Sequence, residues 1–116
     1  MNETLQVLDK LLDVSALRQR VLANNIANIN TPGFKREDVT FRDAFKEAIE
    51  SGSRQKIEAV QPEVEKDMTA PSRPDGNTVS MQDEMAAMTE NGLLYTLATK
   101  LASAKYSRLH AVIKSR

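Results

Sequence analysis

Residues with the chemistry for catalysis or metal binding are few in this chain of 116 residues. His110 is the only histidine, and there is no cysteine. No carboxylate stands at a metal-ligand spacing from His110. Asp75-Gly76-Asn77 has the start of a calcium-binding loop, but the remaining ligand positions and the closing glutamate are missing. The sequence therefore predicts no catalytic residue, no metal site and no cofactor.

The charge balance narrows the range of partners. Sixteen Lys and Arg residues balance 16 Asp and Glu residues, so the formal net charge is zero. Nucleic acids and anionic membranes are bound through a basic excess, so we expect neither. We also expect no small-molecule substrate, because no set of polar residues converges as an enzyme pocket requires. The N-terminus lacks the basic and apolar regions of a secretion signal, and no apolar run is long enough for a transmembrane segment.

Four asparagines crowd one short stretch of the chain, at positions 24, 25, 28 and 30. Asparagine is a poor helix former, yet this stretch lies at the end of a predicted helix. We interpret the spacing as side-chain amides that bond across helix contacts or to backbone carbonyls near the helix end; a frayed polar end is the alternative. Pro32 and Gly33 follow and predict a firm stop.

Two long helices must position this motif. Residues 3–29 carry two adjacent apolar stripes with steps of three and four, which predicts a helix with a wide apolar face. Residues 80–116 begin with a capping box from Ser80 to Asp83 and then keep a heptad pattern for four repeats, which is typical of a coiled coil. Aromatic residues make up only 4% of the chain. Because so little other apolar material is present, we expect these faces to be buried between chains.

The middle of the chain is more polar. Residues 34–39 read as extended, and a capping box from Thr40 to Asp43 predicts a short helix that ends at Ser51-Gly52-Ser53. Residues 53–79 hold three of the four prolines and few hydrophobic residues. Such a segment is predicted to be a flexible loop, or at best a weak hairpin around Pro71–Gly76.

These elements predict an all-α fold. Long N- and C-terminal helices pack as an antiparallel, coiled-coil-like pair, joined by a short middle helix and a flexible polar loop. The predicted organisation is a single assembly domain with four parts: an N-terminal axial helix at 1–30, a turn and short helix at 31–52, a loop at 53–79 and a C-terminal axial helix at 80–116.

The stripes of the two terminal helices form the predicted assembly interface. Its members are Leu5, Leu8, Leu12, Leu22, Ile26, Met85, Met88, Gly92, Tyr95, Ala102, Tyr106, Leu109 and Ile113.

The asparagine-rich stretch resembles the N-terminal signature of the flagellar rod and hook family of axial proteins. The matching residues are Asn24, Asn25, Ile26, Ala27, Asn28, Asn30, Thr31, Pro32, Gly33 and Phe34. The run Asp75-Gly76-Asn77-Thr78-Val79 and the short length are similar to the small proximal-rod members of that family.

The resemblance implies a structural subunit of the proximal rod of the bacterial flagellar basal body, a part of the motility apparatus in the periplasmic space. Such subunits are exported by the flagellar type III apparatus without a cleaved signal. Their terminal helices polymerise around the export channel and transmit torque. The implied partners are copies of the chain itself, other rod proteins, the basal-body adaptor protein and the export gate. From the residues alone, a generic helical coiled-coil adaptor protein remains the alternative function.

Overall fold

The computed structural model describes residues 2–115, and of Asn2 the backbone only. The molecule is elongated, with extents of 66 × 26 × 14 Å. The elements in chain order are α1 (Asn2–Ala27), β1 (Glu37–Thr40), α2 (Arg42–Ser51), α3 (Arg54–Ala59), β2 (Glu63–Lys66) and α4 (Met81–Lys114).

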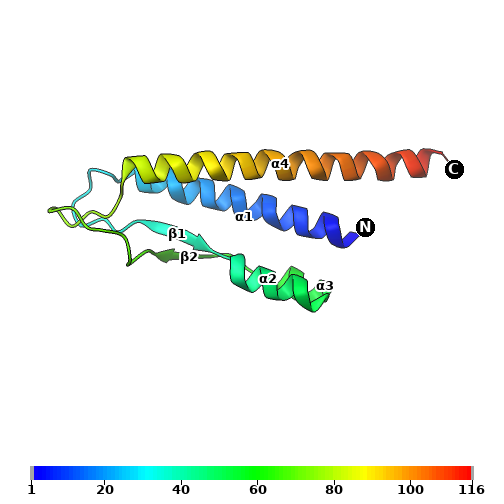
Figure 1. Ribbon diagram of the computed structural model, residues 1–116, viewed down its shortest axis with the longest axis horizontal. Helices are drawn as coiled ribbons and strands as arrows, with labels where there is room; N and C mark the ends of the chain where they lie inside the picture. The colour runs from blue at the N-terminus through cyan, green and yellow to red at the C-terminus, as the bar shows by residue number, and fades with distance from the viewer. Residues whose placement is uncertain (1, 116) are drawn as a thin grey trace.

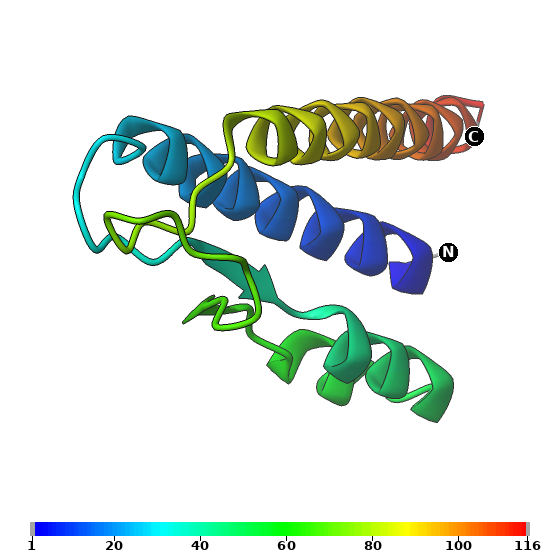
Figure 2. The ribbon, with the colours of Figure 1, turned by 60° about the vertical axis from the view of Figure 1, so that its left-hand side comes forward.

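The two terminal helices lie side by side and run in opposite directions (Figure 1). This confirms the predicted antiparallel pair. The C-terminal end of α4 extends past the start of α1. The strands and the two short helices lie on the side of α1 that faces away from α4 (Figure 2), so α1 is the middle layer of the molecule.

The start of α4 follows the predicted capping chemistry. The Ser80 hydroxyl accepts a hydrogen bond from the backbone N–H of Asp83, with an N···O distance of 3.4 Å. This bond satisfies one of the free amides of the first turn. Asp83 and Glu84 add negative charge where the helix dipole is positive.

The predicted cap of the short helix at Thr40 is wrong. Thr40 belongs to β1, where it pairs with Glu63 of β2, and its hydroxyl donates to the Glu63 carbonyl. The strand pairing holds Thr40 away from the helix, so α2 begins after Phe41, which makes no side-chain cap. The predicted end of α2 is confirmed: Gly52 adopts a φ of +68°, a left-handed C-cap conformation.

The polar segment 53–79 contains more regular structure than its composition predicts. Ser53 caps α3 by accepting from the N–H of Lys56. The strand β2 then pairs antiparallel with β1, with Glu37 opposite Lys66 and Val39 opposite Val64. All four residues of β2 are exposed, so backbone pairing rather than burial of apolar side chains holds this strand.

Two small apolar clusters lie on opposite sides of α1. Leu8 and Leu12 pack with Ala98 and Ala102 of α4. On the other side, Val7, Leu11, Phe41 and Val60 pack around a buried set from α2 and α3, which consists of Phe45, Ala48 and Ile57. Part of the apolar face of α1 is therefore covered within the chain, where the sequence pattern predicted burial between chains.

Candidate assembly interface and the polar junction behind it

Buried residues recur every seven positions on the side of α4 that contacts α1, and two of them are polar. Glu84, Asn91 and Ala98 occupy successive positions of this repeat, and all three are buried. The Asn91 side-chain amide donates to the Ser15 carbonyl at 2.8 Å and to Gln19 Oε1 at 2.7 Å. A buried amide with fixed partners allows only one sliding position of two helices, so Asn91 sets the register of α4 along α1.

A buried ion pair joins the start of α4 to the chain before β1. Glu84 is only 1% exposed, and its Oε1 accepts from Arg36 Nε at 2.5 Å. Arg36 also donates to Asp67 at 2.8 Å and to Asp38 at 3.3 Å. Burial lowers the pKa of Arg36, but hydrogen bonds to Glu84 and the charge of Glu84, with the two aspartates, outweigh it and raise the pKa overall. Arg36 therefore remains a fixed positive charge between three carboxylates.

Asp38 connects the same junction to α1. Its two carboxylate oxygens accept from Arg18 Nε at 2.9 Å and from Arg18 Nη2 at 3.2 Å. Burial raises the pKa of Asp38, while the Arg18 hydrogen bonds, a bond from the Val39 N–H and Arg36 lower it by more. The pKa of Asp67 is also lowered, first by hydrogen bonds from Thr69 and then by Arg36. Both aspartates are held as anions.

Asn25 acts as a substitute strand partner for β1. Its Oδ1 accepts from the Glu37 N–H at 3.0 Å, and its Nδ2 donates to the Glu37 carbonyl at 2.8 Å. The same Nδ2 donates to Glu84 Oε2 at 3.1 Å. One fully buried amide thus links α1, β1 and α4, which confirms that asparagine amides bond across element contacts here.

Asn77 closes the C-terminal end of α1. The side chain is fully buried, and its Nδ2 lies within hydrogen-bond distance of the carbonyls of Asn28, Ile29 and Thr31, at 3.0, 3.1 and 2.8 Å. The last carbonyls of a helix have no partner within the helix. Arg73 donates to the Ile29 carbonyl as well. The loop before α4 therefore satisfies the polar end of α1.

Two glycines allow the turn after α1 and this loop to touch. Gly33 and Gly76 have φ values of +75° and +85°, and a Cβ on Gly76 would lie 3.3 Å from the Gly33 Cα. The Gly33 N–H donates to the Asp75 carbonyl at 2.9 Å. Thr78 then bonds the Phe34 carbonyl through its N–H at 3.0 Å. The sequence motif and the Asp75–Val79 run, 40 residues apart, form one junction.

The predicted interface residues fall into two groups. Leu5, Leu8, Leu22 and Ala102 are buried within the chain. Half-buried members are Leu12, Ile26, Met88, Gly92 and Leu109. Exposed members are Met85, Tyr95, Tyr106 and Ile113. The role of all of them in contacts between subunits stays a prediction.

The outer side of α4 carries a second exposed apolar stripe. Leu94, Leu97 and Leu101 are 44%, 56% and 49% exposed and follow one another at steps of three and four. Leu93 beside them is 69% exposed. A single chain leaves these four leucines in water, and exposed apolar patches of this kind mark interaction sites.

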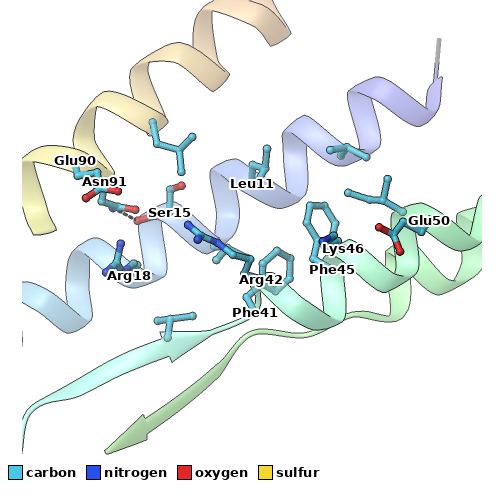
Figure 3. Close-up of a pocket in the computed structure, with 15 residues that line it drawn as sticks. Leu11, Ser15, Arg18, Phe41, Arg42, Phe45, Lys46, Glu50, Glu90 and Asn91 are labelled. Atoms are coloured by element: carbon cyan, nitrogen blue, oxygen red, sulfur yellow. Dashed lines mark hydrogen bonds between the residues drawn. The ribbon is translucent and has the colours of Figure 1, made fainter. Parts of the chain in front are cut away.

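A groove of about 820 Å³ runs along α1 between α4 and α2 (Figure 3). Its apolar wall includes Leu11, Phe41 and Phe45, and Leu94 forms part of its α4 side. Phe41 and Phe45 stack with their ring centroids 4.5 Å apart. A smaller hollow, of about 410 Å³, lies between α1 and α4 beside Gly92 and Tyr95.

Sequence reasoning missed the polar members of this site. Glu84, Arg36, Asp38 and Asn77 read as surface residues, because each has at least one partner that lies 20 or more positions away in the sequence. Only the seven-residue spacing of Glu84, Asn91 and Ala98 was visible as a signal. The heptad predicted from the sequence runs through Met85, Gly92 and Thr99, one position later, because it avoids the polar residues Glu84 and Asn91.

No helix of the described chain has the length and apolarity that crossing a bilayer requires. Among residues 2–115, no group of three or more histidine and carboxylate side chains is arranged to hold a metal ion. The described part of the molecule consists of packed helices, a charged junction and exposed apolar stripes.

Comparison with known proteins agrees with this description. Residues 14–35, which include the asparagine-rich turn, match the family model described as flagella basal body rod protein. The flagellar basal body rod protein FlgB of Borrelia hermsii is 32% identical over 123 residues, covering 90% of this chain and 91% of the relative. FlgB of Escherichia coli K12 is 30% identical and covers 99% and 96% of the two chains.

The alignment with the Escherichia coli relative covers nearly the whole of both chains, and so includes both terminal helices and the junction between them. FlgB of Yersinia enterocolitica is 33% identical over 112 residues. The chain belongs to the FlgB family of flagellar basal-body rod proteins and is a structural subunit of that rod, not an enzyme.

Proposed function

We propose that this subunit polymerises into the proximal rod through the exposed stripes of α4 and the groove along α1. The observation that carries the proposal is the row of half-exposed leucines at 94, 97 and 101 on a helix of 34 residues. Burying a leucine side chain fully is worth about 1.5–3 kcal/mol. A neighbouring helix that covers this row gains that stabilisation, which the single chain lacks.

The partners in this proposal are further copies of the chain, other rod proteins and the basal-body adaptor protein at the export gate. The support is indirect: the apolar stripes run along an elongated molecule, and heterologous contacts between such molecules generate helical assemblies. The tubular assembly would surround the export channel and transmit torque. The buried polar junction keeps α1 and α4 in one register, so that every subunit presents the same surface.

The asparagine-rich turn and residues 34–50 are proposed to contact the next layer outward. This part rests on position: α2 lies on the far side of α1 from α4 (Figure 2). Ile49 on α2 is 39% exposed and lies in the wall of the groove. A neighbour seated in the groove would cover it.

The proposal is tested by blocking the hollow beside Gly92 in the flagellated source organism. Gly92→Trp fills that hollow, and Tyr95→Asp places a charge at its edge. Both variants are expected to abolish swimming in soft agar while the protein remains soluble and helical. Glu58→Lys, on exposed α3, is the matched control and should swim normally. Wild-type motility in both test variants would refute a role in assembly for the exposed stripe of α4 that contains Gly92 and Tyr95.

A further inference from the structure

The outer stripe of α4 is complementary to itself when a second copy runs in the opposite direction. The stripe continues at steps of three and four through Glu90, Leu94, Leu97, Leu101, Ala104 and Arg108. All six side chains are exposed. This is the spacing of the core positions of a two-stranded coiled coil.

Charge is distributed along α4 in the way that antiparallel pairing needs. Residues 81–90 contain three acidic residues and no basic one, whereas residues 91–115 contain Lys and Arg but no Asp or Glu. On the stripe itself, the acidic Glu90 lies at one end and the basic Arg108 at the other. Neither Glu90 nor Arg108 takes part in an ion pair among the residues that the structure describes.

We infer that two free copies of the chain pair through this stripe as an antiparallel coiled coil, with the two-fold axis at the level of Thr99. Residues equally far from Thr99 then face one another. Leu97 meets Leu101 of the second copy, and Leu94 meets Ala104, a large residue opposite a small one. Glu90 meets Arg108, so an ion pair closes each end of the contact.

From Leu97 onward the stripe does not border the groove, whereas Glu90 and Leu94 at its other end also line the groove between α4 and α2, so a second helix would lie along the open edge of that groove. The α2 and α3 helices lie beyond α1, away from α4, in both views of the molecule (Figures 1 and 2). The contact from Glu90 to Arg108 is about 28 Å long at about 1.5 Å per residue. Lys100 of both copies flanks the axis and opposes pairing, but its long side chain can turn its charge into water.

Antiparallel pairing covers the same leucines that the rod contacts are proposed to use, but in a two-fold arrangement that cannot extend into a filament. The pair is therefore a closed form of the free subunit, and it must separate before the stripe can meet a rod. The inference concerns the isolated chain and does not depend on which residues contact the rod.

Sedimentation equilibrium of the purified full-length chain between about 1 and 200 µM tests the pairing. The wild type should pass from monomer to dimer and no further. Glu90→Arg and Arg108→Glu should each weaken the dimer at least tenfold, since like charges then meet at both ends. The double exchange should recover the wild-type constant within about threefold. Lys114→Glu, on another face of α4, is the matched control. Failure of the double exchange to recover pairing would overturn the inference.

Direction is tested separately by disulfide formation, because the chain has no native cysteine. Glu90→Cys mixed with Arg108→Cys should form a mixed disulfide-linked dimer under mild oxidation, and neither variant should link to itself to the same extent. Self-linking of Glu90→Cys would indicate a parallel pair and contradict the proposal. A chain that stays monomeric at every concentration would contradict it as well.

Discussion

Single polar side chains determine how the two ends of this chain meet. Asn25, Asn77 and Asn91 are all buried, and each bonds a different element. A buried amide whose donors and acceptors are all used is stable, whereas the loss of one partner leaves the other without water or protein to bond. The asparagines are therefore connectors between elements.

Replacement of Asn77 by aspartate changes one donor atom and tests whether this asparagine connects the loop before α4 to the end of α1. Asn77→Asp keeps the shape but replaces the Nδ2 donor with an oxygen that faces three carbonyls. We expect the free energy of unfolding to fall by roughly 2–4 kcal/mol, because the buried carboxylate keeps only the Val79 N–H as a donor and its second oxygen faces three carbonyls. Urea unfolding followed by circular dichroism at 222 nm measures the change.

Asn30→Asp makes the same chemical change at an exposed position of the turn that Asn77 contacts. It should alter the stability by no more than about 0.5 kcal/mol. Equal effects of the two substitutions would show that Asn77 does not cap α1.

Among the elements, the helices were predictable and the connections between them only partly so. The periodicity of α1, the Ser80 cap and the Gly52 stop depend on residues within a few positions of each other, and all three are found. The strand β2 and the packing of Asn77 and Thr78 were not predictable, because their partners lie in β1 and in the turn after α1. Thr40 does not cap α2 for the same reason, because it pairs with Glu63 of the distant strand β2.

For the candidate site, the sequence located the asparagine-rich turn but not the charged junction. A glutamate on an amphipathic helix reads as a surface residue unless its partner is known, and the partner of Glu84 is 48 positions away. The apolar stripes were visible because they repeat along one helix. The sequence did not indicate which stripe of α4 faces α1, because the buried positions of α4 include the polar residues Glu84 and Asn91.

The link between α1 and β1 predicts a response to acid. Asp38 has a lowered pKa in the folded chain, so it stabilises the fold fully above its unfolded value of about 3.8. This stabilisation is lost as the pH falls through the lower, folded pKa. Asp38→Asn should lower the stability at pH 7 by roughly 1–2 kcal/mol and flatten the loss of stability below about pH 4.

Thermal unfolding from pH 7 to pH 2 provides the measurement. Asp9→Asn removes an exposed carboxylate that has no ion pair in the described chain and should follow the wild-type curve. An Asp38→Asn curve parallel to the wild type throughout would show that the Arg18–Asp38 pair does not contribute as described.

At the scale of the whole molecule, we propose that folding and assembly use different faces of the same helix. The inner face of α4 holds Glu84, Asn91 and Ala98 against α1, while Leu94, Leu97 and Leu101 are exposed, Leu94 at the edge of the groove. A third side of α4 is mostly polar and carries Thr89, Thr96 and Lys100, with Leu93 among them, all of them exposed. A substitution on the outer face should therefore affect assembly and leave the folded chain intact.

The most direct test of this separation is Leu97→Asp, compared with Thr96→Asp one residue earlier on the polar side. Basal bodies purified from cells that carry each variant should contain rods with Thr96→Asp and lack them with Leu97→Asp. The midpoint of thermal unfolding of both purified chains should stay within a few degrees of the wild type. Normal rods in the Leu97→Asp cells would contradict the assignment of the outer face of α4 to rod assembly.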